Sequence, residues 1–317
     1  MNIKKIGLTA LAASLVSVSA QAGEMSVNGG ASMAIKNNSG VDAGKAITMG
    51  NQLTFTGGGE LDNGLNVSLS FVLDHADNDV SGFDSHSITV SSDALGSITI
   101  AGDGAGNAQS ALDTTAAGDI WNNGFKAGAA DTAYVPMAGS DASDSSVNYT
   151  LPTLVDGLSI AASYSSGGLA VDSTTAFGAT YTGVEGLSVS YGVGENGSTV
   201  ATTSGDVTTM KASYAIGSFT AAVSNTESDK DSTGIDEEMD SWNLSYTVSE
   251  NLSISYGEET HETSGQTVDE EFDAISVSYT TGGMTITAAN YEASGIANTT
   301  GEAGEANRWK LAASFAF

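Results

Sequence analysis

Three pairs of adjacent acidic residues are the side chains of this sequence with the clearest potential for chemistry. They are Glu237-Glu238, Glu258-Glu259 and Glu270-Glu271. Calcium prefers several carboxylate oxygens, so such pairs could hold Ca²⁺. Polar connections bridged loosely by divalent ions explain the pattern better than a defined metal site does. We therefore expect no cofactor beyond loosely bound Ca²⁺ and assign no metal ligand.

Motifs of known catalytic sites do not occur in the sequence. The histidines His75, His86 and His261 show no metal-ligand spacing with one another, and neither G-x-S-x-G nor H-E-x-x-H is found. The stretch GDGAGN, beginning at Gly102, does not match the dinucleotide-binding pattern G-x-G-x-x-G. We therefore expect a protein that is not an enzyme.

Basic residues are scarce. The 317 residues contain 9 Lys and Arg against 38 Asp and Glu, for a net charge of −29, and Arg308 is the only arginine. Binding to nucleic-acid phosphates needs a basic surface. The composition therefore excludes nucleic acid as a partner. The chain also has no cysteine, which excludes disulfides and thiol chemistry.

The acidic pairs stand among segments in which apolar and polar residues alternate. In SYTVSENLSISYGEE, from Ser245 to Glu259, the alternation is interrupted once by a short polar break. Alternation with period two on both sides of such a break predicts a β-hairpin. The same unit recurs regularly, because Tyr149, Tyr181, Tyr214, Tyr246 and Tyr279 are spaced 32 or 33 residues apart.

Extending this pattern along the chain predicts sixteen strands, the first two at 25–36 and 47–59. Connections after even strands are short, and those after odd strands are mostly long, polar and acidic. An even strand number with this alternation of connections is typical of an outer-membrane β-barrel. The apolar stripe would face lipid, and the strands must close, since lipid tolerates no open sheet edge. A soluble sandwich or an acidic β-solenoid is the alternative, because soluble strands alternate too.

The first 22 residues differ from the rest. Lys4 and Lys5 precede an apolar run from 6 to 18, and Ala20-Gln21-Ala22 follows. This is the pattern of a secretory signal peptide. We therefore predict a signal peptide at 1–22 and an exported barrel at 23–317, in the outer membrane of a Gram-negative bacterium.

The last segment, ANRWKLAASFAF, has apolar residues at every second position and ends at Phe317. A terminal aromatic residue after such alternation resembles the assembly signal of Gram-negative outer-membrane proteins. With this terminal pattern and sixteen predicted strands, the chain resembles the general diffusion porins. It is most similar to their alphaproteobacterial, Rhodobacter-type branch.

The resemblance implies a homotrimer of all-β, sixteen-stranded antiparallel barrels, each with an inward-folded third external loop that narrows the pore. The connection at 104–143, after the fifth strand, is long enough for that role. Its aromatic residues Trp121, Phe125 and Tyr134 would pack against the wall. Its acidic residues would form one side of the constriction, and we name Asp113, Asp119 and Asp131.

The same family sets basic residues on the wall facing that loop. Trp309 and Leu311 are on the lipid-facing parity, so Arg308 and Lys310 would face the pore, and parity also turns Lys36 and Lys211 inward. Closure of the first strand onto the last would bring Lys36 near Arg308 and Lys310. A solvated cluster at the rim is the alternative interpretation.

We therefore expect a water-filled channel for passive diffusion of small hydrophilic solutes and ions. The acidic excess predicts a preference for cations, because clefts focus the field of their charges. The expected partners are two further copies of the chain, outer-membrane lipid and lipopolysaccharide, and the barrel-assembly machinery. A substrate-specific channel, a barrel enzyme and an acidic surface adhesin are the alternative functions.

Overall fold

The computed structural model describes residues 25–40, 44–74, 84–103, 106–112, 114–122, 140, 145–167, 172–197, 204–231 and 235–317. The predicted signal peptide at 1–22 lies outside these residues. Within them the chain is almost entirely β-structure, with three short 3₁₀ turns. No helix in the described ranges has the length and apolar character that a membrane crossing requires.

Sixteen strands are formed by the described residues. The strands are β1 Ser26–Gly40, β2 Gly44–Glu60, β3 Asn66–Asp74, β4 Ser85–Ser92, β5 Gly96–Asp103, β6 Ser146–Thr150, β7 Leu158–Ser165, β8 Thr174–Tyr181, β9 Leu187–Asn196, β10 Gly205–Ile216, β11 Phe219–Lys230, β12 Glu237–Ser249, β13 Leu252–Thr263, β14 Glu270–Thr281, β15 Met284–Ser294 and β16 Ala306–Ala316. The 3₁₀ turns are η1 Ile120–Asn122, η2 Ile296–Asn298 and η3 Gly301–Gly304.

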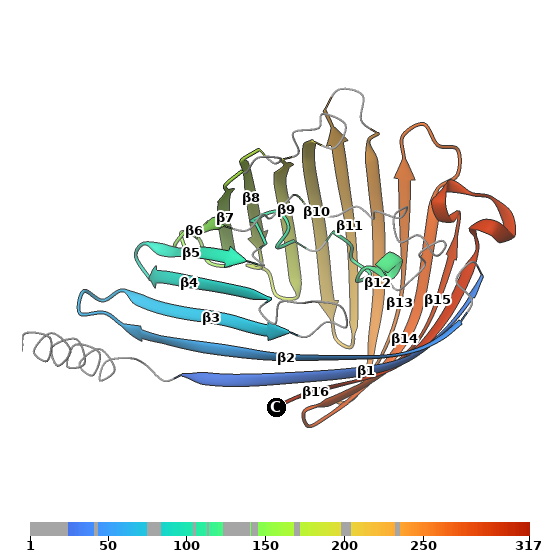
Figure 1. The fold of residues 1–317 in the computed structure, drawn as a ribbon, viewed down its shortest axis with the longest axis horizontal. Helices are drawn as coiled ribbons and strands as arrows, with labels where there is room; N and C mark the ends of the chain where they lie inside the picture. The colour runs from blue at the N-terminus through green and yellow to red at the C-terminus, as the bar shows by residue number, and fades with distance from the viewer. Residues whose placement is uncertain are drawn as a thin grey trace, which may run out of the picture.

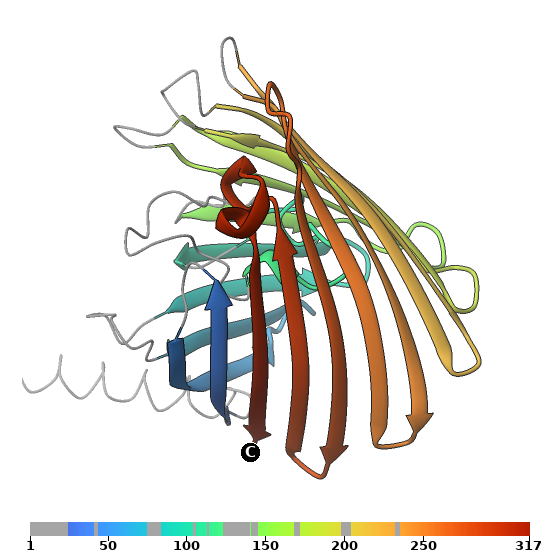
Figure 2. The same cartoon turned by 90° about the vertical axis from the view of Figure 1, so that its right-hand side faces the viewer.

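The strands form one closed barrel in chain order (Figures 1 and 2). Each pairs antiparallel with its neighbours, and β1 closes onto β16 with Ile35 opposite Leu311. Closure matters because an open edge would leave unpaired N–H and C=O groups facing hydrocarbon. The predicted sixteen-stranded antiparallel barrel is therefore confirmed.

Alternation along each strand separates two faces. On β12, Leu244 and Tyr246 are 46% and 41% exposed on the outer face, whereas Ser241 on the opposite parity is 5% exposed. Outer residues of neighbouring strands meet, as in the ring contact of Phe219 with Tyr246 at 4.7 Å between centroids. The outer face is therefore the apolar surface predicted to meet lipid, and the inner face is polar.

The connections differ in length at the two ends of the barrel. Tight turns follow β10 and β14, where Gly217 and Gly282 adopt φ of 58° and 56°, a region that glycine enters without strain. The chain end at β16 lies at this same end of the barrel (Figure 2). The connection between β1 and β2 is shorter than predicted, because polar residues expected in a loop stay paired as far as Asn38 opposite Gly44.

Candidate functional site

The inner face of β7 and β10–β13 holds the described parts of the connection that follows β5. The backbone N–H of Ala108 donates to Oγ of Ser163 on β7 at 2.9 Å. Nε2 of Gln109 donates to Oγ1 of Thr209 on β10 at 2.8 Å. Figure 1 shows this segment crossing the side of the sheet that faces β1–β3. The segment is thus fixed to the wall at two strands that lie three positions apart in the ring.

The next stretch continues across the wall. Nζ of Lys211 on β10 donates to the carbonyl oxygen of Thr115 at 2.8 Å. Oγ of Ser241 on β12 accepts from the successive amides of Ala116 and Ala117, at 3.1 and 3.0 Å. The segment is therefore held by hydrogen bonds between its own backbone groups and side chains on the inner face of the strands.

A buried carboxylate binds the end of this stretch. Glu259 on β13 is 1% exposed. Its Oε1 accepts from the amide of Ile120 at 2.9 Å, and its Oε2 accepts from the amide of Trp121 at 3.0 Å. Beside it, Ile120 packs in an apolar cluster with Phe272 and Ile296. That cluster joins the connection after β5 to the connection after β15.

Two inner glycines make room for the segment. A Cβ at Gly178 on β8 would collide with the carbonyl oxygen of Ala108, and one at Gly257 on β13 would lie 2.8 Å from Cβ of Ala117. Any side chain there would push the segment off the wall. Glycine at these inner positions is a sequence signal for a segment that lies on the wall.

The acidic residues predicted for the constriction fall in two groups. Asp113 and Asp131 lie outside the described residues, as do Phe125 and Tyr134. Asp119 is described, with a φ of 53°. Its Oδ1 accepts a hydrogen bond from Oγ1 of Thr115 at 3.1 Å. Its backbone amide donates to Oγ1 of Thr115 at 2.8 Å. Asp119 therefore helps to hold a local turn.

The four basic residues predicted to face the pore also fall into two groups. Lys36 lies directly opposite Lys310 across the β1–β16 pair, and Arg308 is two positions further along β16. Arg308 is 7% exposed. These three residues therefore stand together on one face of neighbouring strands, whereas Lys211 is bound to the segment after β5.

Each predicted acidic pair is divided between the two faces. Consecutive residues of a strand point to opposite sides. Glu259 binds the inner segment, while Glu258 on the outer face accepts from Nε1 of Trp242 at 2.9 Å. Glu270 is 3% exposed, and its neighbour Glu271 is exposed. Across the described part of the chain, no group of three or more His, Cys, Asp or Glu is placed to hold a metal ion.

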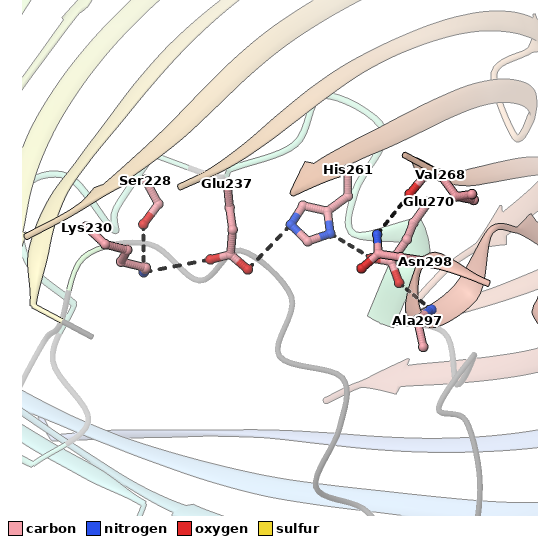
Figure 3. Close-up of polar contacts among 8 residues, drawn as sticks. All are labelled: Ser228, Lys230, Glu237, His261, Val268, Glu270, Ala297 and Asn298. Carbon is pink, nitrogen blue, oxygen red and sulfur yellow. Dashed lines mark hydrogen bonds and ion pairs between the residues drawn. The ribbon is translucent and has the colours of Figure 1, made fainter. Parts of the chain in front are cut away.

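A polar network joins the long-connection ends of four strands (Figure 3). Nδ1 of His261 lies 2.7 Å from Oε2 of Glu270, and Nε2 lies 3.7 Å from Oε1 of Glu237. Glu237 also lies 3.7 Å from Nζ of Lys230. The second oxygen of Glu270 accepts from the amide of Ala297 at 2.6 Å. The network therefore ties η2 to the ends of β11–β14. Local sequence patterns could not predict it, because its contacting members are 7 to 27 residues apart.

An acidic cavity of about 350 Å³ lies at the same end of the barrel. Its acidic lining residues are Glu227, Asp229, Asp236, Glu237, Glu238, Glu262 and Asp269.

The terminal residue completes the closure. The amide of Phe317 donates to the carbonyl oxygen of Gly29 at 3.0 Å, and the amide of Gly29 donates back to Phe317 at 2.7 Å. The ring covers Gly29, where any Cβ would collide with it. Phe317 thus extends the β1–β16 pair by one residue at the short-turn end.

A closed antiparallel barrel with an apolar outer face and a polar inner face is the architecture of an outer-membrane β-barrel protein. Residues 7–317 match the family model of the Gram-negative porins. The chain belongs to this family, and it is an integral protein of the Gram-negative outer membrane. Both predictions are confirmed. None of the curated proteins that were compared matches the sequence.

Solved structures agree on the fold. A porin refined at 1.8 Å resolution is 16% identical, with a TM-score of 0.67 over 93% of this chain and 100% of that one. OmpT of Vibrio cholerae is 17% identical, with a TM-score of 0.64 over 92% and 97% of the two chains. A mutant of the Rh. blastica porin is 15% identical, with a TM-score of 0.64 over 93% and 100%. Family and fold point to a channel rather than an enzyme.

Proposed function

We propose that this chain forms a water-filled, cation-preferring channel for small hydrophilic solutes, narrowed by the connection at 104–143. The observation that carries the proposal is the seating of residues 106–122 on the inner wall. Hydrogen bonds from β7, β10, β12 and β13 hold that stretch across the wall. A segment held inside a barrel reduces the open cross-section, and the field within it then acts on passing ions.

The preference for cations rests on the distribution of acids. The cavity at the long-connection end has seven carboxylates in its lining, which would concentrate cations at the channel entrance. Asp113 and Asp131 on the connection would add to this field. The opposing charges are Lys36, Arg308 and Lys310. We expect the acids to dominate because Asp113 and Asp131 are on the proposed constriction itself and the cavity adds seven carboxylates.

The reversal potential across a planar bilayer tests this proposal. Screening lengths are ~10 Å at 0.1 M salt and ~3 Å at 1 M, so selectivity should be clear in dilute KCl and fade in concentrated KCl. Neutral replacements of Lys36 and Lys310 should strengthen the cation preference, and Asp131→Asn should weaken it. Anion preference in dilute salt would refute the charge assignment while leaving the channel itself intact.

The assembly proposed for the chain is a homotrimer. One of the similar structures, OmpT of Vibrio cholerae folded in vitro, is described as a trimer form, at 16% identity and a TM-score of 0.63 over 94% and 100% of the two chains. We also propose that residues 1–22 direct export and that the barrel-assembly machinery recognises Phe317 as the assembly signal. The barrel would contact lipopolysaccharide, and the acidic rim would bind Ca²⁺ loosely. Cross-linking in native membranes, with trimer bands expected, tests the assembly.

A further inference from the structure

We infer that Glu259 is the positioning residue that holds the segment after β5 against the wall and thereby keeps the open channel at one width. This inference rests on the proposed function, since it concerns the segment proposed to narrow the pore. It assigns a role to one side chain on the wall, whereas the proposed function concerns the connection as a whole.

The geometry of the contact supports this role. The two oxygens of Glu259 receive one backbone N–H each, at 2.9 Å from Ile120 and 3.0 Å from Trp121. Both distances are typical of well-formed N–H···O bonds. Glu259 is 1% exposed, so water does not compete for these oxygens. Two bonds to adjacent amides fix both the position and the direction of the segment, which a single bond would not.

The chemistry of the acceptor matters as well as its position. A carboxylate offers acceptors on both oxygens, and hydrogen bonds to a charged group are stronger than those between neutral groups. An amide in its place would turn one NH₂ toward a backbone N–H, so one bond would become a conflict between two donors. Glutamine has nearly the same size as glutamate, but it cannot accept a hydrogen bond from both amides.

The other contacts of the segment differ in kind. Oγ of Ser241 serves the amides of Ala116 and Ala117 with one neutral hydroxyl. Ile120 is held beside Phe272 by apolar contacts, which are not directional. Together with the bonds of Gln109 and Lys211, the Ser241 bonds hold the segment as far as Ala117, whereas the apolar cluster gives Ile120 no fixed direction. Glu259 supplies the directional contact at its buried end, so its loss should release that end while the barrel stays closed.

The experiment records single-channel currents from the full-length protein carrying E259Q, E259A or the control E250Q. Glu250 is exposed in the short turn before the same strand, and it does not line the acidic cavity. Its replacement by glutamine makes the same chemical change as E259Q. Hydrogen bonds to a charged group each shift an equilibrium roughly tenfold. We expect the frequency of transitions between current levels to rise roughly tenfold in E259Q and more in E259A. E250Q should match the unmodified protein.

Heat-modifiable migration on gels separates this role from a general loss of folding, and E259Q is expected to migrate as the unmodified protein does. Steady, unmodified currents in a folded E259Q would overturn the inference. Equal noise in E259Q and E250Q would also overturn it, because the effect would then follow charge alone. An unmodified protein that gives no current would instead refute the proposed function.

Discussion

Replacing Gly178 with valine should force the segment after β5 away from the wall. A Cβ at this position would collide with the carbonyl oxygen of Ala108. The colliding atom belongs to the backbone, so no side-chain rotation can relieve the contact. Either the segment or strand β8 must shift, and β8 is held on both sides by its pairing with β7 and β9. We therefore expect the segment to shift.

The cost follows from the bond that the shift breaks. The segment would have to retreat by roughly 1 Å to restore an ordinary contact distance. The bond from the amide of Ala108 to Oγ of Ser163 is now 2.9 Å long, so such a shift would take it out of hydrogen-bonding range. Ala108 is 7% exposed, and its amide would be left without an acceptor. Leaving a buried donor unsatisfied costs about 1–3 kcal/mol.

Urea unfolding in lipid vesicles, followed by tryptophan fluorescence, measures this loss, and planar-bilayer currents measure the effect on the pore. Gly57 on β2 provides the control, because an added Cβ there would meet no atom within 4 Å. Gly178→Val should lose about 1–3 kcal/mol and change its conductance, while Gly57→Val should stay within about 0.5 kcal/mol. Equal behaviour of the two variants would refute the placement of the segment against β8.

Three further outcomes are expected. Ser241→Ala removes the acceptor of two amides, so the urea midpoint should report a loss of about 1–3 kcal/mol, and an unchanged midpoint would contradict the contact. Glu270→Ala removes both the acceptor of the Ala297 amide and the partner of His261, so hydrogen exchange at the Ala297 amide should quicken, whereas equal exchange would contradict the network. Deleting Phe317 removes the backbone bonds to Gly29 and should lower the folded fraction on heat-modifiable gels; Phe317→Tyr should retain it.

The strands were predictable because each carries its own pattern. Alternation through Leu244, Tyr246 and Val248 requires only neighbours along the chain, and the same is true of the other strands. Closure followed from the absence of any tolerable edge in lipid. Strand ends were less predictable. Asn37 and Asn38 are polar residues typical of loops, and they remain in β1 because β2 offers them partners in register.

The seating of the segment after β5 could not be predicted in this way. Gln109 bonds to Thr209 and Ile120 bonds to Glu259, so each pair is separated by 100 residues or more. Local periodicity carries no information about such pairs. Parity places Glu259 on the inner face and Glu258 on the outer face, so the interpretation of Glu258-Glu259 as a pair that could share one ion did not respect the strand geometry.

Parity also changes what the acidic composition means for the channel. On β11–β15, most strand acids share the outer parity of the exposed residues Val223, Trp242 and Tyr256. These acids are Glu227, Asp229, Glu238, Asp240, Glu258, Glu262, Glu271, Asp273 and Glu292.

The acids on the inner parity of these strands, Glu237, Glu259 and Glu270, are each bound to a cation or to backbone amides. A net charge of −29 therefore does not translate directly into a negative lumen. A cation preference would have to arise at the rim and on the connection at 104–143, against the wall cluster that contains Lys36. Neutralising the acids that line the rim cavity should therefore reduce selectivity more than neutralising outer acids that do not line it, such as Asp273.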